Sequence, residues 1–363
     1  MKLAIVGIQG LPNNYGGFET LAEFLVEYLS ADLDITVYCS SKDLQARLPE
    51  YKGAKLRYIG VSSHGAFGML YDSMSLLDAI SKFDKILLLG FGAGFTMPFL
   101  KRFRNKIILN FGGLDWQRNK WSKFTQQIIR RSEALLVRNS GHVISDNIGI
   151  QEYIDATYKK NSTLIAYGGD QAKKETISVE TSDTYKDFIN NPFAFSVARI
   201  QPDNNIEMIL EAFRMQNRIP LVMVGNWNNS AYGKEMKLKY TDVRNLILLD
   251  AIYDTKKLNE LRSNCLIYVH GHSAGGTNPS LVEAMNIGLP VFSYASGYNE
   301  STTGNQAVYF RNSKELTWLI ESFEVSDLQI QAKKLKAIAE KDYKWEIITD
   351  QYKKVIMHSY ADL

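Results

Sequence analysis

The chain has 363 residues, enough for two domains, and its 45 % apolar and 22 % charged residues are ordinary values for a globular protein. A net charge of +3 does not by itself indicate nucleic acid, and no Cys-x-x-Cys pair or Cys/His cluster indicates a zinc site. No apolar stretch reaches the roughly 20 residues of a membrane-spanning helix, and the first residues resemble a strand rather than a secretory signal.

Apolar runs alternate with helical patterns through the first half of the chain. Residues 2–7 (KLAIVG) form a short apolar run that predicts a buried parallel strand, and a turn-rich loop follows at 10–17. Residues 18–29 carry apolar side chains at helical spacing, which predicts an amphipathic helix. Further strands are expected at 34–39, 55–61, 85–89, 106–111, 134–138 and 162–166, with helical stretches at 69–82 and 95–103.

The same alternation restarts near residue 192. Strands are expected at 192–198, 220–225, 246–249, 265–270 and 290–293, and helices at 205–214, 256–264, 280–287, 313–321, 327–340 and 345–357. The polar, helix-poor residues 167–191 form the expected linker. We therefore predict an α/β protein with two doubly wound, Rossmann-like domains, at 1–168 and 169–344. Because such sheets bind ligands beyond the carboxyl ends of their strands, two facing sheets would enclose the loops at 7–17 and 271–279 in one cleft.

The most informative loop follows the strand that ends at His270, with the sequence HGHSAGGTNPSLVEAM. Its glycines permit positive φ and a close approach of the backbone to a ligand. Asn278 suits the N-cap of the next helix and Pro279 its first position, so the helix N-terminus could hold a diphosphate without a metal ion. Glu283, one turn further, would reach ribose hydroxyls. The alternative is an ordinary strand–turn–helix with a glycine turn.

The run Glu283-Ala-Met-Asn-Ile-Gly-Leu-Pro-Val resembles the signature of retaining GT-B glycosyltransferases, a family that includes sucrose synthases and many bacterial glycan-assembly enzymes. In that family two glutamates lie eight residues apart. Here Glu283 is the second, whereas Gly275 stands at the first position. The resemblance implies that His272, as a catalytic residue, or the donor-binding backbone amides of Gly276, Thr277 and Asn278 replace the missing carboxylate.

A second segment, Val197-Ala-Arg-Ile-Gln-Pro-Asp-Asn-Asn, resembles the family segment in which an arginine and a lysine grip the donor diphosphate. Arg199 stands at the arginine position and Asn204 at the lysine position. A guanidinium fork suits phosphate oxygens, and the loss of the lysine removes one positive charge. The alternative for Arg199 is a surface ion pair.

Two longer motifs, YGGFET at 15–20 and GGTNPS at 275–280, resemble a bacterial subgroup that contains rhamnosyltransferases acting on polysaccharide and lipid-linked intermediates. The resemblance covers nearly the whole chain. It implies metal-independent hexosyl transfer, with retention and no cofactor, of L-rhamnose from dTDP-rhamnose or of a UDP-linked sugar. The acceptor would be lipid-diphosphate-linked or a glycan, in capsule or cell-wall synthesis. It also implies that the last helix, within 345–363, completes the acceptor-binding first domain.

The first domain supplies the expected acceptor contacts. Gly17 would let the first loop approach the donor diphosphate, and Asp115 is the expected acid/base group. Alternatives are an N-cap role for Asp115, at a helix beginning near Trp116, and a helix-dipole or capping role for Glu19. The residues expected to bind the acceptor are Tyr15, Gly16, Phe18, Glu19 and Trp116.

The most basic stretch of the chain mixes aromatic residues with cations: Lys101, Arg102, Arg104, Trp116, Arg118, Lys120, Trp121, Lys123, Arg130 and Arg131. Such a mixture suits a membrane surface and an anionic lipid-diphosphate acceptor, although a solvated helix face is the alternative. No nucleic-acid reader motif accompanies it. The expected location is therefore the cytoplasm, with peripheral attachment to the inner face of the cell membrane.

Two other functions are open at this stage. The missing glutamate and lysine would also suit a catalytically inactive nucleotide-sugar-binding protein. An NAD(P)-dependent oxidoreductase is suggested by the glycines after the first strand. However, Pro12 stands where the dinucleotide fingerprint expects a helix start, and the third glycine of that fingerprint is missing.

Overall fold

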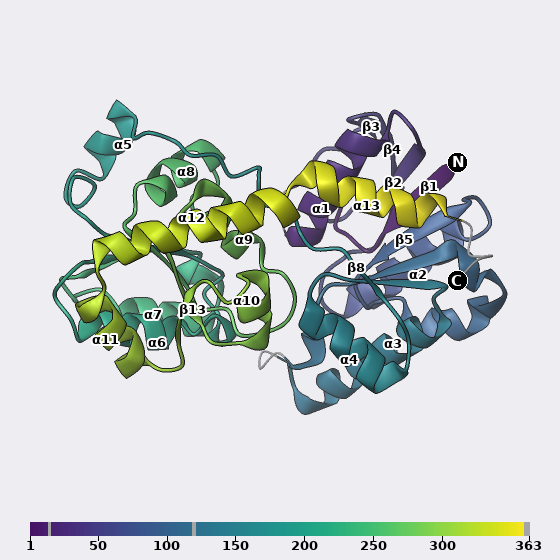
Figure 1. The fold of residues 1–363 in the computed structure, drawn as a ribbon. Helices are drawn as coiled ribbons and strands as arrows, with labels where there is room; N and C mark the ends of the chain where they lie inside the picture. Colours follow the sequence, from purple (N-terminus) through teal and green to yellow (C-terminus); the bar gives the residue numbers. More distant parts are fainter. Residues whose placement is uncertain (14–15, 118–120, 359–363) are drawn as a thin grey trace. The chain divides into compact units, whose positions relative to one another are not determined.

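The computed structural model describes residues 1–13, 16–117 and 121–358, the side chain of Ala66 excepted. The chain forms two compact units, Met1–Tyr167 together with Trp345–Leu363, and Gly168–Lys344 (Figure 1). No helix in the described segments is both long enough and apolar enough to cross a membrane.

Unit 1 is built on a sheet with the strand order β3-β4-β2-β1-β5-β6-β7-β8, parallel except for the β3–β4 pair. The strands are β1 (Lys2–Val6), β2 (Asp34–Ser40), β3 (Glu50–Tyr51), β4 (Ala54–Ile59), β5 (Lys85–Leu89), β6 (Ile107–Phe111), β7 (His142–Ser145) and β8 (Thr163–Leu164). The helices, with 3-10 helices written η, are α1 (Gly17–Leu29), α2 (Ala66–Ala79), η1 (Gly94–Lys106), η2 (Asp115–Gln117), α3 (Lys123–Asn139), α4 (Ile148–Tyr158) and α13 (Trp345–Met357).

Unit 2 has a fully parallel sheet with the order β11-β10-β9-β12-β13-β14. The strands are β9 (Ala194–Val197), β10 (Leu221–Val224), β11 (Leu246–Leu249), β12 (Ile267–His270), β13 (Val291–Tyr294) and β14 (Val308–Phe310). The helices are α5 (Val179–Thr184), η3 (Pro202–Asn204), α6 (Ile206–Arg214), η4 (Trp227–Asn229), α7 (Ala231–Tyr240), α8 (Thr255–Ser263), α9 (Pro279–Ile287), α10 (Gly297–Thr302), α11 (Ser313–Ser322) and α12 (Val325–Asp342).

Each sheet has one point where its strand order reverses. In unit 1 successive strands run outward from β1 on one side and from β5 on the other, so the switch point lies between these two strands. In unit 2 it lies between β9 and β12. Doubly wound sheets bind ligands at such points, because the loops after the two strands diverge there and leave space. The predicted α/β, doubly wound fold is confirmed.

One predicted element is wrong in kind, and the helical stretch at 95–103 takes the 3-10 form. Residues 134–138 (ALLVR) belong to α3, and the neighbouring strand is β7 instead. A short apolar run fits a buried strand and a buried helix turn equally well, and here Ser122 caps a helix through its contact with the Thr125 N–H. Residues 95–103 form a 3-10 helix, in which Pro98 has no N–H to donate to an α-helical ladder. The expected linker also contains α5.

The last helix, α13, belongs to unit 1. The Trp345 ring stacks on Phe24 of α1 with centroids 4.3 Å apart, and Trp345 is 1 % exposed. Further along α13, the Tyr352 hydroxyl accepts a hydrogen bond from Asn110 at the end of β6. The end of the chain therefore covers the sheet with which the chain begins.

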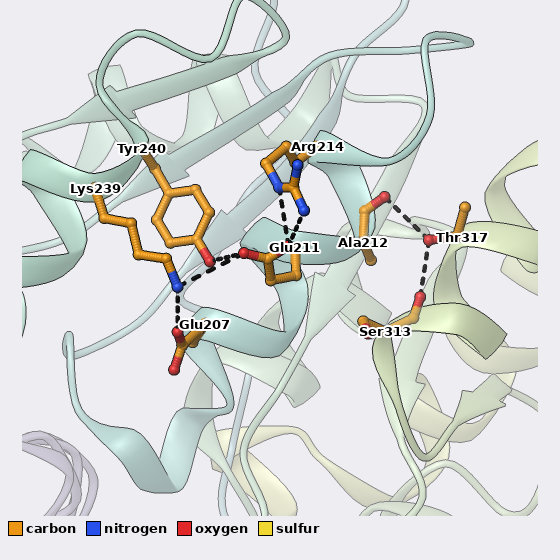
Figure 2. A network of polar contacts seen from close by, with 8 residues as sticks. All are labelled: Glu207, Glu211, Ala212, Arg214, Lys239, Tyr240, Ser313 and Thr317. Atoms are coloured by element: carbon orange, nitrogen blue, oxygen red, sulfur yellow. Dashed lines mark hydrogen bonds and ion pairs between the residues drawn. The ribbon is translucent and has the colours of Figure 1, made fainter.

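In unit 2 polar contacts join α6 to the two helices beside it (Figure 2). Lys239 of α7 is paired with Glu207 of α6 at 2.6 Å, and Thr317 of α11 donates to the Ala212 carbonyl at 3.1 Å. Glu211 accepts from the Tyr240 hydroxyl and pairs with Arg214. These contacts hold α6, and with it the loop between β9 and α6 that enters the candidate site.

Candidate active site

Two loops of unit 2 meet at the β9–β12 switch point. The side-chain amide of Asn205 donates to the Gly271 carbonyl at 2.8 Å, and the backbone N–H of Ser273 donates to the Asp203 carbonyl at 2.9 Å. A Cβ on Gly271 would lie 2.2 Å from the Asn204 carbonyl oxygen, so only glycine permits this approach. The structure therefore brings together two of the segments that the sequence singled out.

Arg199, Asn204 and His272 form a chain of contacts at this point. The Asn204 side-chain amide donates to the Arg199 carbonyl at 2.6 Å, and this bond orients its oxygen toward Nδ1 of His272, 2.7 Å away. Nδ1 therefore donates to this oxygen, which leaves Nε2 as the ring nitrogen that can meet a ligand. Asn204 and His272 are 7 % and 8 % exposed, whereas the Arg199 side chain is exposed. The asparagine at the lysine position thus orients the histidine.

The glycine turn and the cap of α9 follow the sequence prediction. Gly275 and Gly276 have φ values of +60° and +72°, a region that L side chains rarely adopt. Asn278 caps α9 by accepting from the Ser280 N–H at 3.1 Å, and Pro279 is the first helical residue. Thr277 is buried between them. The N-terminus of α9 begins at the switch point, where its dipole favours an anion.

Glu283 has two partners that sequence reasoning did not find. Its carboxylate pairs with Nη1 of Arg262 on α8, and Gln171 donates to its other oxygen at 2.7 Å. Arg262 is only 2 % exposed and also donates to the Asn259 side chain at 2.7 Å. Each carboxylate oxygen can accept a second hydrogen bond, so the expected ribose contact is compatible with this pairing. Glu283 is thus also a counter-ion for a buried cation.

His270, the last residue of β12, is buried beneath the loop. It is 4 % exposed, and its Nε2 has no hydrogen-bond partner among the described residues. Burial, with a smaller contribution from His272, lowers the pKa of His270 to about 3. The ring is therefore neutral at physiological pH, and His272 is the histidine beside the loop surface.

In unit 1 the two sequence motifs 15–20 and 110–121 meet through Phe18. A Cβ on Gly112 would lie 2.3 Å from Cζ of the Phe18 ring, so the ring lies directly over this glycine. Gly16 is the N-cap of α1 and Gly17 its first residue. Tyr15 lies outside the described residues. The Phe18 contact joins the loop after β1 to the loop after β6.

Glu19 is buried and holds the loop after β1 through a hydrogen bond. It is 6 % exposed, and its carboxylate accepts the backbone N–H of Gln9 at 2.9 Å. Burial raises the pKa of Glu19, while the hydrogen bond from Gln9 opposes that rise. These contacts give Glu19 a structural role in the loop after β1.

Asp115 and Trp116 lie in η2, which packs against α3. Asp115 starts this short 3-10 helix, and the N-cap of the following helix α3 is Ser122. The Arg130 guanidinium lies 4.8 Å from the centroid of the Trp116 ring. Burial raises the pKa of Glu133 on α3, and the negative charge of nearby Asp115 adds to this rise. Arg118 and Lys120 lie outside the described residues.

Asp72 of α2 is a further carboxylate that the sequence did not reveal. Gly92, in the loop after β5, donates its backbone N–H to Asp72, yet burial raises the pKa of this carboxyl to about 7. A Cβ on Gly92 would lie 2.1 Å from Oδ2 of Asp72. A carboxyl group with a pKa near 7 can exchange a proton at physiological pH. Its position beside the β1–β5 switch point makes it a second candidate acid/base group.

Comparison with known proteins defines the class. Residues 182–345 match the family described as Glycosyl transferases group 1, and residues 1–170 match a Domain of unknown function (DUF1972). No curated protein matches the sequence. Together with the glycine loop and the capped helix at the β9–β12 switch point, the family match defines the protein as a glycosyltransferase.

Solved structures define the fold over almost the entire chain. Sucrose-phosphate synthase from Thermosynechococcus elongatus is 16 % identical, with a TM-score of 0.82 and 98 % of both chains covered. HepE from Anabaena, solved with UDP and glucose, is 16 % identical, with a TM-score of 0.75 and coverages of 98 % and 99 %. The trehalose-6-phosphate synthase OtsA is 9 % identical, with a TM-score of 0.74 and coverages of 98 % and 99 %. The protein therefore has the GT-B fold.

Proposed function

We propose that this glycosyltransferase moves a sugar from a nucleoside-diphosphate sugar to a lipid-diphosphate-linked or polysaccharide acceptor in bacterial surface-glycan synthesis. The proposed donor is dTDP-L-rhamnose, with a UDP-linked sugar as the alternative. The YGGFET and GGTNPS motifs support this choice, because they resemble those of bacterial rhamnosyltransferases. Transfer retains the anomeric configuration and needs neither a metal ion nor another cofactor.

The observation that carries the proposal is the Arg199–Asn204–His272 arrangement beside the N-terminus of α9. An exposed guanidinium, a helix N-terminus and a histidine ring that donates from Nε2 when it is protonated are three groups that bind phosphate oxygens. All three belong to the loops of one switch point. Nucleotide binding by HepE, which was solved with UDP and with UDP-glucose, supports a nucleoside diphosphate as the ligand.

The proposed chemistry places the leaving diphosphate against these groups. As the bond from the anomeric carbon to the phosphate oxygen breaks, negative charge grows on the diphosphate, and donors that are already oriented stabilise it. The acceptor hydroxyl attacks from the same face, and its proton passes to the leaving phosphate. Asp115 orients that hydroxyl for the attack. Glu283 binds the ribose with the acceptor capacity that its ion pair leaves.

We also propose that the protein works in the cytoplasm, attached peripherally to the inner face of the membrane. The cations that support this location are Lys101, Arg102, Arg104, Lys123, Arg130 and Arg131, all of them exposed. Cations near an anionic leaflet each add to the attraction.

A panel of nucleotides measured by thermal shift tests the donor site. We expect dTDP or UDP to raise Tm, because a ligand that binds only the folded state stabilises it. His272→Ala should weaken nucleotide binding by about tenfold to a hundredfold, as expected for loss of a hydrogen bond to a charged group. His358→Ala, an exposed histidine at the end of α13, is the control. Equal affinities of the His272→Ala variant and the wild type would remove His272 from the donor site.

Transfer itself is measured with the matching nucleotide-sugar and a short glycan acceptor. NMR of the product should show the anomeric configuration of the donor, and inversion would contradict the proposed same-face attack. Activity should survive EDTA. Tight nucleotide binding without transfer to lipid-linked or soluble acceptors would favour the inactive binding protein instead.

A further inference from the structure

Helix α2 of unit 1 exposes a stripe of large apolar side chains. Phe67, Leu70, Met74 and Leu77 are 63 %, 49 %, 42 % and 51 % exposed. Their spacing of three, four and three residues puts them on one side of the helix, over a length of about 15 Å. A surface helix normally presents polar residues on this side. The stripe is therefore an apolar surface that unit 1 itself does not cover.

The opposite side of the same helix is packed into unit 1. Tyr71, Ser75, Leu76 and Ala79 are each 0 % exposed. Since the buried side already anchors the helix, the exposed stripe contributes nothing to the core. Contiguous exposed apolar surface on a folded unit marks a binding surface.

The neighbouring 3-10 helix η1 packs against α2 and combines aromatic with basic side chains. Phe95 is 44 % exposed and Phe99 is 85 % exposed. Lys101, Arg102 and Arg104 follow directly and are exposed as well, and residues 94–106 contain no acidic residue. On α2 the acidic Asp78 is paired with Arg57 and Lys82.

We propose that the stripe of α2 and the exposed aromatic and basic residues of η1, together the α2–η1 surface, dock onto an anionic lipid bilayer. The apolar side chains enter the interface between headgroups and acyl chains, and the η1 cations bind the lipid phosphates. A two-fold dimer through this surface would instead gather the cations of two copies. This inference rests on the proposed peripheral membrane location. It adds that α2, which lies outside the basic stretch of residues 101–131, supplies the apolar contacts with the membrane.

Flotation of the full chain with vesicles tests this surface. The wild type should float with vesicles of equal phosphatidylglycerol and phosphatidylcholine, and far less with pure phosphatidylcholine. Leu70→Gln/Leu77→Gln should weaken binding to the anionic vesicles at least tenfold, and glutamine keeps the helix propensity close to that of leucine. Leu238→Gln, at a leucine of α7 that is 84 % exposed, is the matched control and should bind like the wild type.

A second double variant, Lys101→Gln/Arg102→Gln, should lose binding to anionic vesicles by a similar factor and remove most of its salt dependence. Equal flotation of the wild type and the Leu70→Gln/Leu77→Gln variant would overturn the proposal. So would a dimer in solution that this variant converts to a monomer, because the stripe would then bind a second copy. Nucleotide thermal shift without vesicles is measured on every variant. It reports on the donor site and on folding, so failure of the membrane surface is distinguishable from failure of the proposed function.

Discussion

At the scale of single residues, Glu283 combines an ion pair in the structure with the ribose contact that we propose. As a ribose ligand it must offer lone pairs to a substrate, and as the partner of Arg262 it must neutralise a cation that is 2 % exposed. A buried guanidinium that loses its counter-ion costs far more than an exposed one. The same carboxylate therefore contributes to stability before any donor binds.

Glu283→Gln should lower the free energy of unfolding of unit 2 by about 3 kcal/mol, because it leaves the Arg262 charge buried without a counter-ion. Denaturant unfolding followed by hydrogen exchange in α8 and α9 measures the loss. Asp250→Asn, which breaks the exposed pair with Lys237, should cost less than about 1 kcal/mol. The double variant Arg262→Met/Glu283→Gln should recover part of the loss. The single variant Arg262→Met is measured as well. If the double variant loses as much stability as the two single variants together, the ion pair with Arg262 is not the reason that Glu283 stabilises unit 2.

At the scale of elements, one aromatic ring joins the loop after β1 to the loop after β6. Phe18 lies in the first turn of α1, and Gly112 follows β6. Since the ring occupies the position that a side chain at 112 would need, the two loops have little freedom to move independently. Gly112 is thus a packing requirement between two motifs that are distant in sequence.

Gly112→Ala should displace the Phe18 ring and shift the loop before α1. We expect a loss of about 1–3 kcal/mol in stability, the usual cost of overpacking, and at least a tenfold loss of transfer activity. Gly60→Ala is the control, because a Cβ there meets nothing within 4 Å. The double variant Phe18→Leu/Gly112→Ala should recover stability. Wild-type stability and activity of Gly112→Ala would show that the ring does not constrain the two loops.

The sequence predicted most elements because their cause is local. Apolar runs between turns indicated the strands, and the cap and glycine turn of α9 depend on neighbouring residues alone. The strand predicted at 134–138 is wrong because a run of five mostly apolar residues fits a strand and a helix turn equally well. The Asn204–His272 contact and the Arg262–Glu283 pair join residues 68 and 21 positions apart, and no local pattern encodes such pairings. Burial, which sets the pKa of Asp72, is likewise a property of the folded unit.

At the scale of the whole molecule, unit 1 is discontinuous in sequence. The chain leaves it at Tyr167 and returns at Trp345, whose ring stacks on Phe24 and meets the Tyr167 ring with centroids 4.8 Å apart. The Trp345 ring therefore contacts aromatic rings from the beginning and from the end of the first segment of unit 1. Because these contacts span almost the full chain, unit 1 can complete its core only after α13 is available.

Trp345→Ala should destabilise unit 1 by about 3–5 kcal/mol, the usual cost of emptying a buried aromatic site. Hydrogen exchange should accelerate first in α1 and α13, which lose the stacked ring. Trp227→Ala is the matched control, since this tryptophan is 0 % exposed in the core of unit 2 and its loss should accelerate exchange in α7 and β11 instead. Nucleotide affinity should survive in the Trp345→Ala variant, because Arg199, His272 and Glu283, the side chains proposed to bind the nucleotide, belong to unit 2. If Trp345→Ala leaves exchange in α1 unchanged, α13 is an appendage of unit 1 and not a part of its core.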